Sequence, residues 1–139
     1  MGTRRQAREH ALQILYQIDM TGDPPEATFE LHWREGRAAA EARTFAEELV
    51  EGTVADAALI DDLIRESSEN WRVERMPIVD RNVIRLAIHE LLRRKDTPAP
   101  VVLNEAIELA KKFGGEGSAE FVNGVLDAVR KTIEARAGA

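Results

Sequence analysis

The segment from Pro77 to Lys95 most constrains the fold, because its apolar residues cover well over half of a helical wheel. A helix that is apolar nearly all round is buried on several sides. The segment therefore predicts a central helix with other elements packed around it. Arg93, Arg94 and Lys95 follow at its end, where positive charge favours the helix dipole. The apolar residues are Ile78, Val79, Val83, Ile84, Leu86, Ala87, Ile88, Leu91 and Leu92.

The next segment, residues 101–130, predicts a helical hairpin that packs on this central helix. Pro100 suits the first helical position, where the missing N–H would be unpaired anyway. Gly114 and Gly115 can adopt positive φ and end the first helix, and Ser118 is a candidate N-cap for the second. Apolar residues repeat with helical spacing in both halves. The first face holds Leu103, Ala106, Ile107, Ala110 and Phe113, and the second holds Val122, Val125, Leu126, Val129 and Ile133.

Helical spacing recurs through the rest of the chain, and no run of alternating apolar and polar residues predicts a strand. We expect a helix from Thr3 to Met20, with its core face on Ala7, Ala11, Ile14, Leu15 and Ile18. A second helix follows, from about Pro24 to Glu35, with Asp23 as N-cap, Pro24 at its first position and Gly36 at its end.

The segment from Ala38 to Ser67 is helical again but longer than most helices, so we expect a break at Gly52–Thr53. Its core candidates are Phe45, Leu49, Leu59, Ile60, Leu63 and Ile64. The polar connector 67–70 predicts a boundary between two sub-bundles, about 1–70 and 71–139. The sequence thus indicates one compact all-α domain over 1–139, with about seven helices.

Composition narrows the functional classes. The chain has no cysteine, which excludes disulfides and thiolate metal sites and fits a reducing cytoplasm. No apolar run is long enough to span a membrane, and no apolar region follows the N-terminal arginines as in a secretory signal. The net charge is −6 over 139 residues, which argues against binding along extended phosphate backbone.

The motifs of several kinds of active site are missing. The glycine cluster 114–117 lacks the Lys-Ser/Thr of a phosphate-binding loop and carries Glu116. No histidine follows a glutamate by three positions, as a di-iron bundle requires. We therefore expect no catalytic residue, metal or cofactor. In the central helix, Asp80 suits the helix start, Glu90 can pair with Arg93 or Arg94, and His89 is expected on a polar face or at a cap.

The N-terminal decapeptide is a small basic tip on an otherwise acidic chain. It holds Arg4, Arg5 and Arg8 against Glu9, a net charge of +2 that leaves −8 for the other residues. One flank of the predicted helix, beside its core face, holds Arg5, Arg8, Leu12 and Tyr16. Arginines that bind phosphate, next to an aromatic ring that stacks on a base, are typical of single-stranded RNA binding. A solvated N-terminal turn explains the same residues, and the pattern alone does not separate the two.

Three stretches together resemble the NusB family of bacterial transcription antitermination factors. The N-terminal helix reads RRQAREHALQILY from Arg4, and the central helix reads VDRNVIRLAIHEL from Val79. The hairpin reads VVLNEAIELAKKF from Val101 and FVNGVLD from Phe121. The match touches both ends and the middle of the chain, whereas residues 22–70 match only in their helical pattern.

The resemblance implies an all-α fold of two sub-bundles and a protein without catalytic activity. It implies binding to the boxA element of nascent RNA, together with the small-subunit ribosomal protein NusE. That assembly joins an RNA polymerase elongation complex with other Nus factors and suppresses premature termination, notably in ribosomal RNA operons. The implied RNA-binding residues are Arg4, Arg5, Arg8, Tyr16, Gly117, Phe121 and Asn123. Gly117 stands where some relatives carry an acid, and Phe121 equally suits packing at a close helix crossing with Gly124 and Ala128.

The acidic body predicts weak RNA binding by the protein alone, strengthened by a basic ribosomal partner. Two alternatives stay open. One is a helical protein-interaction module with no direct role in RNA binding. The other is a stand-alone relative of the NusB-like RNA-binding domain of ribosomal RNA cytosine methyltransferases. A homodimer is also compatible with the sequence, and it could cover the basic N-terminal turn.

Overall fold

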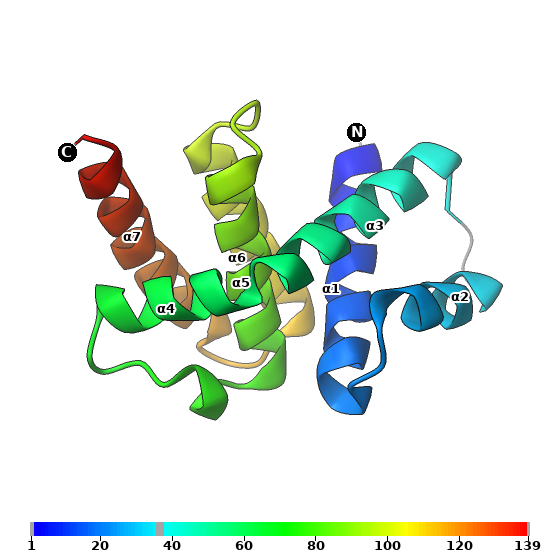
Figure 1. Ribbon diagram of the computed structural model, residues 1–139, viewed down its shortest axis with the longest axis horizontal. Coiled ribbons are helices and arrows are strands. Elements are labelled where there is room, and N and C mark those ends of the chain that lie inside the picture. Colours follow the sequence, from blue (N-terminus) through cyan, green and yellow to red (C-terminus); the bar gives the residue numbers. More distant parts are fainter. Residues whose placement is uncertain (1, 36–37, 139) are drawn as a thin grey trace.

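The computed structural model describes residues 2–35 and 38–138, and all regular elements in these ranges are helical (Figure 1). The all-α prediction is therefore confirmed. Gly36, which we expected to end the second helix, lies outside the described residues. In the described ranges, every helix is too short or too polar to span a lipid bilayer. The elements are α1 (Thr3–Thr21), α2 (Pro25–Glu35), α3 (Ala40–Ala55), α4 (Ala57–Ser67), the 3₁₀ turn η1 (Val73–Arg75), α5 (Ile78–Arg93), α6 (Ala99–Phe113) and α7 (Ser118–Ala137).

Helix α5 is the central helix, as its apolar circumference predicted. It contacts α1, α3, α4, α6 and α7, and in Figure 1 it lies in the middle of the molecule. Its buried residues include Val83, Ile84, Leu86, Ala87, Ile88 and Leu91. Four polar residues of α5 are buried as well, namely Asp80, Asn82, His89 and Glu90. Three of the four, all but Asp80, hydrogen-bond to side chains of α1 or of the bend between α3 and α4, so polar contacts as well as apolar packing fix α5 in place.

Helices α6 and α7 form the predicted hairpin against α5. In α7 the predicted face is confirmed, because Val122, Val125, Leu126 and Val129 are buried and Ile133 is half-buried against the core. In α6 the buried face is turned from the prediction: it holds Val102, Ala106, Leu109 and Ala110, whereas Leu103, Ile107 and Phe113 are only half-buried. Helix α6 contacts both α5 and α7, and these two neighbours set which side of α6 is covered.

The turn between α6 and α7 uses its glycines differently from the prediction. Gly114 is extended, with φ −89° and ψ −172°, and the left-handed residue is Gly117, with φ 83°. Gly114 is needed for another reason, because a Cβ there would lie 2.6 Å from the Ser118 hydroxyl and 2.7 Å from the Ala110 carbonyl oxygen. Ser118 is the first residue of α7 and not its N-cap. Its hydroxyl instead accepts a hydrogen bond from the Gly115 N–H at 3.0 Å.

The predicted break at Gly52–Thr53 is wrong, because α3 continues to Ala55 and the chain bends at Asp56. Leu59 is also misplaced by the prediction: it is 42 % exposed, whereas Ile60, Leu63 and Ile64 are buried. Helix α4 is rich in apolar residues, but its packing on α5 and α7 covers only one side of it. Leu59 lies outside that side and so stays exposed.

The start of α2 also differs slightly from the prediction. The helix begins at Pro25, and the Pro24 carbonyl accepts a hydrogen bond from the Thr28 N–H at 3.2 Å. Asp23 does not cap the helix with its side chain. Its own N–H donates to the Thr21 hydroxyl at 3.1 Å, which places Asp23 in the turn that follows α1.

Helix α4 joins the two halves of the chain. The Ser67 and Thr132 hydroxyls lie 2.9 Å apart, and Glu66 forms an ion pair with Arg136 of α7. The division into two sub-bundles near residue 70 stays a prediction. Helix α4 precedes that point in the chain but packs against α5 and α7, which follow it.

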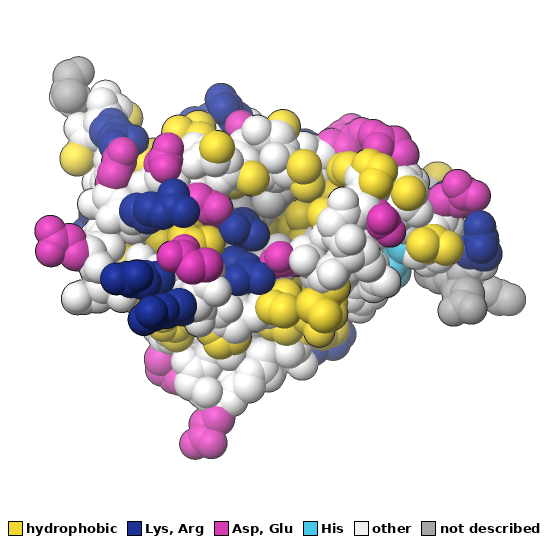
Figure 2. Space-filling view, turned by 60° about the horizontal axis from the view of Figure 1, so that its bottom comes forward, with side chains coloured by type: hydrophobic (Ala, Val, Ile, Leu, Met, Phe, Trp, Pro, Cys, Tyr) yellow, Lys and Arg dark blue, Asp and Glu magenta, His cyan; other side chains and the backbone are white. Residues whose placement is uncertain are grey.

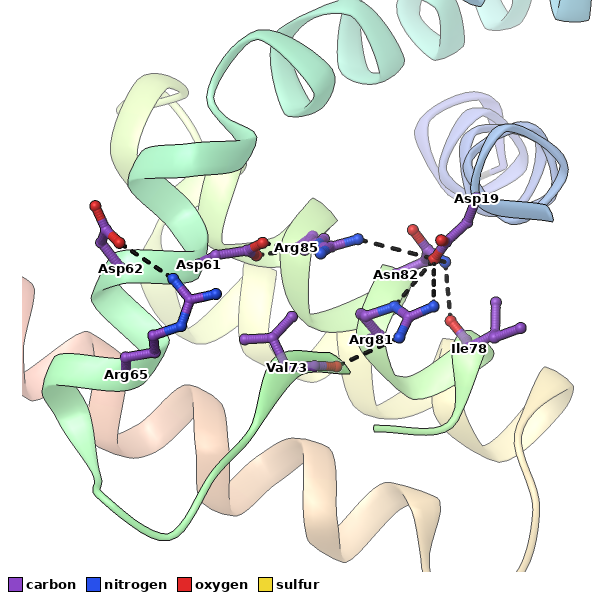
Figure 3. A network of polar contacts seen from close by, with 9 residues as sticks. All are labelled: Asp19, Asp61, Asp62, Arg65, Val73, Ile78, Arg81, Asn82 and Arg85. Carbon is purple, nitrogen blue, oxygen red and sulfur yellow. Dashed lines mark hydrogen bonds and ion pairs between the residues drawn. The ribbon is translucent and has the colours of Figure 1, made fainter. Parts of the chain in front are cut away.

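A polar network ties α1, α4 and α5 together on one side of the molecule (Figure 3). One Asp19 oxygen accepts hydrogen bonds from the Arg81 guanidinium and the Asn82 amide at 2.8–3.0 Å. Arg85 donates two hydrogen bonds to Asp61 at 3.0 and 2.9 Å. These arginines are held by carboxylates within the protein, which makes them structural cations.

Candidate nucleic-acid interface

A groove runs between α1 and α6, and ion pairs bridge it. Arg5 donates to both carboxylate oxygens of Glu105, at 3.1 and 2.7 Å. About one turn further along α1, Glu9 accepts two hydrogen bonds from Lys112, at 2.9 and 3.0 Å. The pairs advance in the same direction on both helices, so α1 and α6 run parallel. This part of the groove has a volume of about 370 Å³.

Arg8 points into the protein and not toward solvent, with only 4 % of its surface exposed. Its guanidinium donates two hydrogen bonds of 2.8 Å to the two oxygens of Glu90 on α5. Burial alone would lower the pKa of Arg8, but the hydrogen bonds and the charge of Glu90 raise it above its ordinary value. The expected pairing of Glu90 with Arg93 or Arg94 is therefore wrong. Arg93 pairs instead with Asp56, at 3.0 Å, and Arg94 with Glu48.

Arg4 lies at the surface on an aromatic ring. Its guanidinium carbon is 4.7 Å from the centre of the Phe45 ring, and that of Arg94 is 4.9 Å from the same centre. A cation over an aromatic face is attracted by the ring quadrupole. Arg4 also approaches Asp96 at 3.7 Å. Phe45, predicted only as a core residue, thus fixes two arginines near the start of α1.

Tyr16 belongs to a second, larger groove near the C-terminal end of α1. This groove has a volume of about 760 Å³ and is lined by residues from α1, from η1 and its flanks, and from the α6–α7 turn. Tyr16 is 38 % exposed, and Gly117 and Phe121 lie in the same lining. The structure therefore brings together three of the residues that the resemblance implied. Asn123 is exposed on α7 but does not line the groove.

Phe121 is half-buried and packs against the core while it lines this groove. The alternative of a close helix crossing at Gly124 is wrong, because a Cβ built on Gly124 has no atom within 4 Å. Phe121 is therefore an aromatic side chain with one part anchored and one part facing the groove.

The sequence does not predict that Trp71, Arg72 and Arg75 line this groove. They come from the connector and the 3₁₀ turn η1, and only the position of η1 next to the α6–α7 turn brings them into the groove. The one sequence signal was an aromatic residue that directly follows a polar connector. With them, the groove combines two arginines and four aromatic side chains, the others being Tyr16, Phe113 and Phe121.

The charges on the face drawn in Figure 2 are mixed. Basic side chains lie beside acidic ones, with apolar side chains between them, and they do not form a continuous basic stripe. In the described part of the chain, no group of three or more His, Cys, Asp or Glu residues could hold a metal ion. The prediction that His89 lies on a polar face or at a cap is wrong. His89 is buried, and its Nδ1 lies 3.1 Å from Asp56.

Known proteins resemble this chain over most of its length. The model of the NusB family matches residues 5–131. The chain is 45 % identical to transcription antitermination protein NusB of Sorangium cellulosum, over 96 % of this chain and 95 % of the relative. It is 48 % identical to the protein of the same name from Desulforapulum autotrophicum, over 94 % and 92 % of the two chains.

Solved structures of similar proteins have the same fold. NusB of T. maritima superposes with a TM-score of 0.82 at 37 % identity, over 92 % of this chain and 90 % of that one. A crystal structure of antitermination factors NusB and NusE in complex with double-stranded RNA gives a TM-score of 0.85 at 31 % identity, over 95 % and 98 %. The family model and the relatives cover nearly the whole chain, and so this chain belongs to the NusB family.

Proposed function

We propose that this protein is a cytoplasmic transcription antitermination factor that binds boxA-type RNA of nascent transcripts, notably ribosomal RNA. It acts with the ribosomal protein NusE in an RNA polymerase elongation complex that contains other Nus factors. Curated relatives at 45–48 % identity are named as antitermination proteins, and a related structure holds NusB, NusE and RNA together. The family consists of RNA-binding factors and not enzymes, and the proposal assigns no catalytic residue.

The observation that carries the RNA part of the proposal is the arrangement along α1. Arg4 and Arg5 lie exposed at its start, and Tyr16 lies in the large groove near its end. Eleven residues of helix separate Arg5 from Tyr16, which is roughly 16 Å. A short single strand spans that distance, with its phosphates on the arginines and its bases on the aromatic side chains.

The residues implied by the family resemblance have different parts in this proposal. Arg4 and Arg5 contact phosphates, and Tyr16 and Phe121 stack on bases in the groove. Gly117 offers backbone in place of a side chain, where its left-handed conformation brings the chain to the edge of the groove.

Arg8 does not contact RNA in this proposal. Its buried ion pair with Glu90 holds α1 against α5 and so positions the α1 surface. Asn123 follows Phe121 by two positions and so points to a different side of α7. An RNA contact there requires a strand that continues past the groove around the start of α7.

The charge distribution supports cooperation with a basic partner. The whole chain carries a net charge of −6, and the cations near the start of α1 are partly neutralised by Asp96 and Glu105. Counterion release from few phosphates gives weak binding that salt readily reverses. A basic ribosomal protein supplies the additional positive charge, and electrostatic complementarity to the acidic body favours their association.

The test is fluorescence anisotropy of a short labelled boxA-type RNA, with and without NusE. The variants are Arg5→Glu and Tyr16→Ala. The control is Arg34→Glu, which reverses the charge of an exposed arginine of α2; among the described residues this arginine pairs with Glu30 of the same helix. We expect NusE to strengthen RNA binding by the unmodified protein. Arg5→Glu and Tyr16→Ala should weaken it at least tenfold, the equivalent of about 1.4 kcal/mol, and Arg34→Glu should leave it nearly unchanged.

Circular dichroism of each variant establishes that the helices are intact. If the folded protein fails to bind RNA with and without NusE, the proposal is wrong and a protein-interaction module without an RNA role takes its place. If Arg34→Glu weakens binding as much as Arg5→Glu does, overall charge and not the α1 surface determines binding.

A further inference from the structure

We propose that Glu105 is an internal competitor for RNA phosphate: it occupies the guanidinium of Arg5 and so restrains the affinity of the α1 surface. This inference rests on the proposed function, and it assigns a regulating residue to the same site. Glu105 lies on α6, a hundred positions along the chain from Arg5, so the pairing is a product of the fold.

The geometry of the pair is that of a phosphate contact. The Arg5 Nε and Nη2 atoms donate to the two oxygens of Glu105, at 3.1 and 2.7 Å. Arginine binds carboxylate and phosphate through the same planar fork of donors. Glu105 therefore fills the edge of the guanidinium on which a phosphate would bind with two hydrogen bonds.

The two partners differ in exposure. The Arg5 side chain is 51 % exposed, whereas that of Glu105 is only 12 % exposed. The hydrogen bond from Arg5 lowers the pKa of Glu105, and the charges of Arg5 and Arg8 act in the same direction against burial. Glu105 is accordingly ionised at neutral pH and held in place, while Arg5 remains within reach of an RNA strand.

Arg8 does not compete with Arg5 for the Glu105 carboxylate. Its Nε and Nη2 atoms are bonded to Glu90, and its Nη1 atom lies 3.9 Å from Glu105. A phosphate that binds Arg5 must therefore use its remaining donors or displace Glu105 from its bidentate contact. In the first case the phosphate meets a guanidinium whose charge Glu105 already neutralises, and in the second the free energy gained from the phosphate is reduced by what is lost with the carboxylate.

The chain offers a matched control three positions further along α6. Glu108 lines the same groove and acts on Arg5 through its charge, but no hydrogen bond joins the two in the described structure. Glu105→Gln and Glu108→Gln remove the same charge from the same helix. Only the first removes the carboxylate that occupies the Arg5 donors.

The experiment measures RNA affinity with NusE present, for the unmodified protein, both single variants, Arg5→Gln and the double variant Arg5→Gln/Glu105→Gln. We expect Glu105→Gln to tighten binding about two- to fivefold, as the loss of a partly exposed ion pair predicts. The slope of log affinity against log salt should steepen by about 0.7, the value for one more neutralised phosphate of a single strand. Glu108→Gln should give a smaller gain and no steeper slope.

The double variant shows whether the effect passes through Arg5. In the Arg5→Gln background, Glu105→Gln should bring no gain, because no guanidinium remains to be released. A gain of equal size there, equal gains from Glu105→Gln and Glu108→Gln, or weaker binding by Glu105→Gln would each overturn the inference. If the unmodified protein binds RNA and Arg5→Glu abolishes binding, such a result removes only the role of Glu105. If the unmodified protein binds no RNA, the proposed function fails together with the inference.

Discussion

Gly52 of α3 packs directly against the imidazole ring of His89 on α5. A Cβ on residue 52 would lie 2.2 Å from Cε1 and 2.4 Å from Nε2 of that ring. The ring itself is held by Asp56, whose carboxylate lies 3.1 Å from Nδ1. Gly52 therefore does not break α3; it allows α3 and α5 to approach closely.

Gly52→Ala should destabilise the protein by about 1–3 kcal/mol, because the buried ring cannot move aside without loss of its contact with Asp56. The matched control is Gly124→Ala, where a Cβ meets no atom within 4 Å. That substitution should stabilise the protein by about 0.4–1 kcal/mol through reduced freedom of the unfolded chain. Urea unfolding of both variants measures the two effects, and equal effects would show that the Gly52–His89 contact has no consequence.

The buried pair of Arg8 and Glu90 should make each single substitution costly. Arg8→Met leaves the Glu90 carboxylate without its partner in the core, and we expect a loss of about 3–5 kcal/mol. The double variant Arg8→Met/Glu90→Leu removes both charges and should recover most of that loss. Chemical unfolding of the two variants tests this, and a double variant as unstable as the single one would contradict the argument.

Gly117 should tolerate substitution less well than Gly115 in the same turn. Gly117 has φ 83°, a conformation that costs a residue with a Cβ about 1–2 kcal/mol, and Gly115 does not have positive φ. Neither position is crowded. In thermal unfolding, Gly117→Ala should therefore lower the stability, Gly117→Asn should lower it less, and Gly115→Ala should be nearly neutral. An equal loss at both positions would show that the backbone conformation is not the cause.

The histidines that join α1 and α2 should make stability depend on pH. His10 Nδ1 lies 2.9 Å from His32 Nε2, and burial lowers the pKa of both rings from the ordinary value of 6.5. The unfolded chain then binds more protons than the folded one just below pH 6.5, so stability is full above that pH and falls as the pH decreases.

Urea unfolding at pH 7.5 and 5.5 measures this effect, and His32→Gln should reduce the difference between the two. The interactions that lower the pKa of Glu105 and Asp56 are lost only below their ordinary values of 4.5 and 3.8. Carboxylate protonation therefore does not obscure the comparison at pH 5.5. An identical pH dependence in His32→Gln would assign the effect to other groups.

The sequence predicted those parts of the fold that depend on local pattern. Because apolar residues cover most of the circumference of α5, the helix must be surrounded by other elements, and this prediction is confirmed. The role of Glu90 failed because the rule for pairs on one helix cannot reach a partner on another, and Arg8 is 82 positions away. In the α6–α7 turn the glycines indicated where the chain reverses. The local pattern does not show which of them is left-handed, and in the structure it is Gly117, whereas Gly114 lies against Ser118.

The candidate site was predicted only in part, because local sequence pattern does not show which distant segments meet in the fold. The resemblance implied Tyr16, Gly117 and Phe121, and the structure gathers them in one groove. Trp71, Arg72 and Arg75 follow no helical period and have no motif. Their place in the groove depends on how the connector before α5 lies next to the α6–α7 turn, which is a property of the assembled helices.

The pairing of Arg8 with Glu90 also constrains how the chain matures during synthesis. Helix α1 is made first, yet the carboxylate that neutralises its buried arginine comes 82 residues later. At the usual pace of translation this is a delay of roughly 4–16 s. During that interval α1 can contact α2 and α3 but not α5, and the guanidinium of Arg8 lacks the carboxylate that pairs with it in the folded protein. The N-terminal helix therefore completes its packing only after the central helix has left the ribosome.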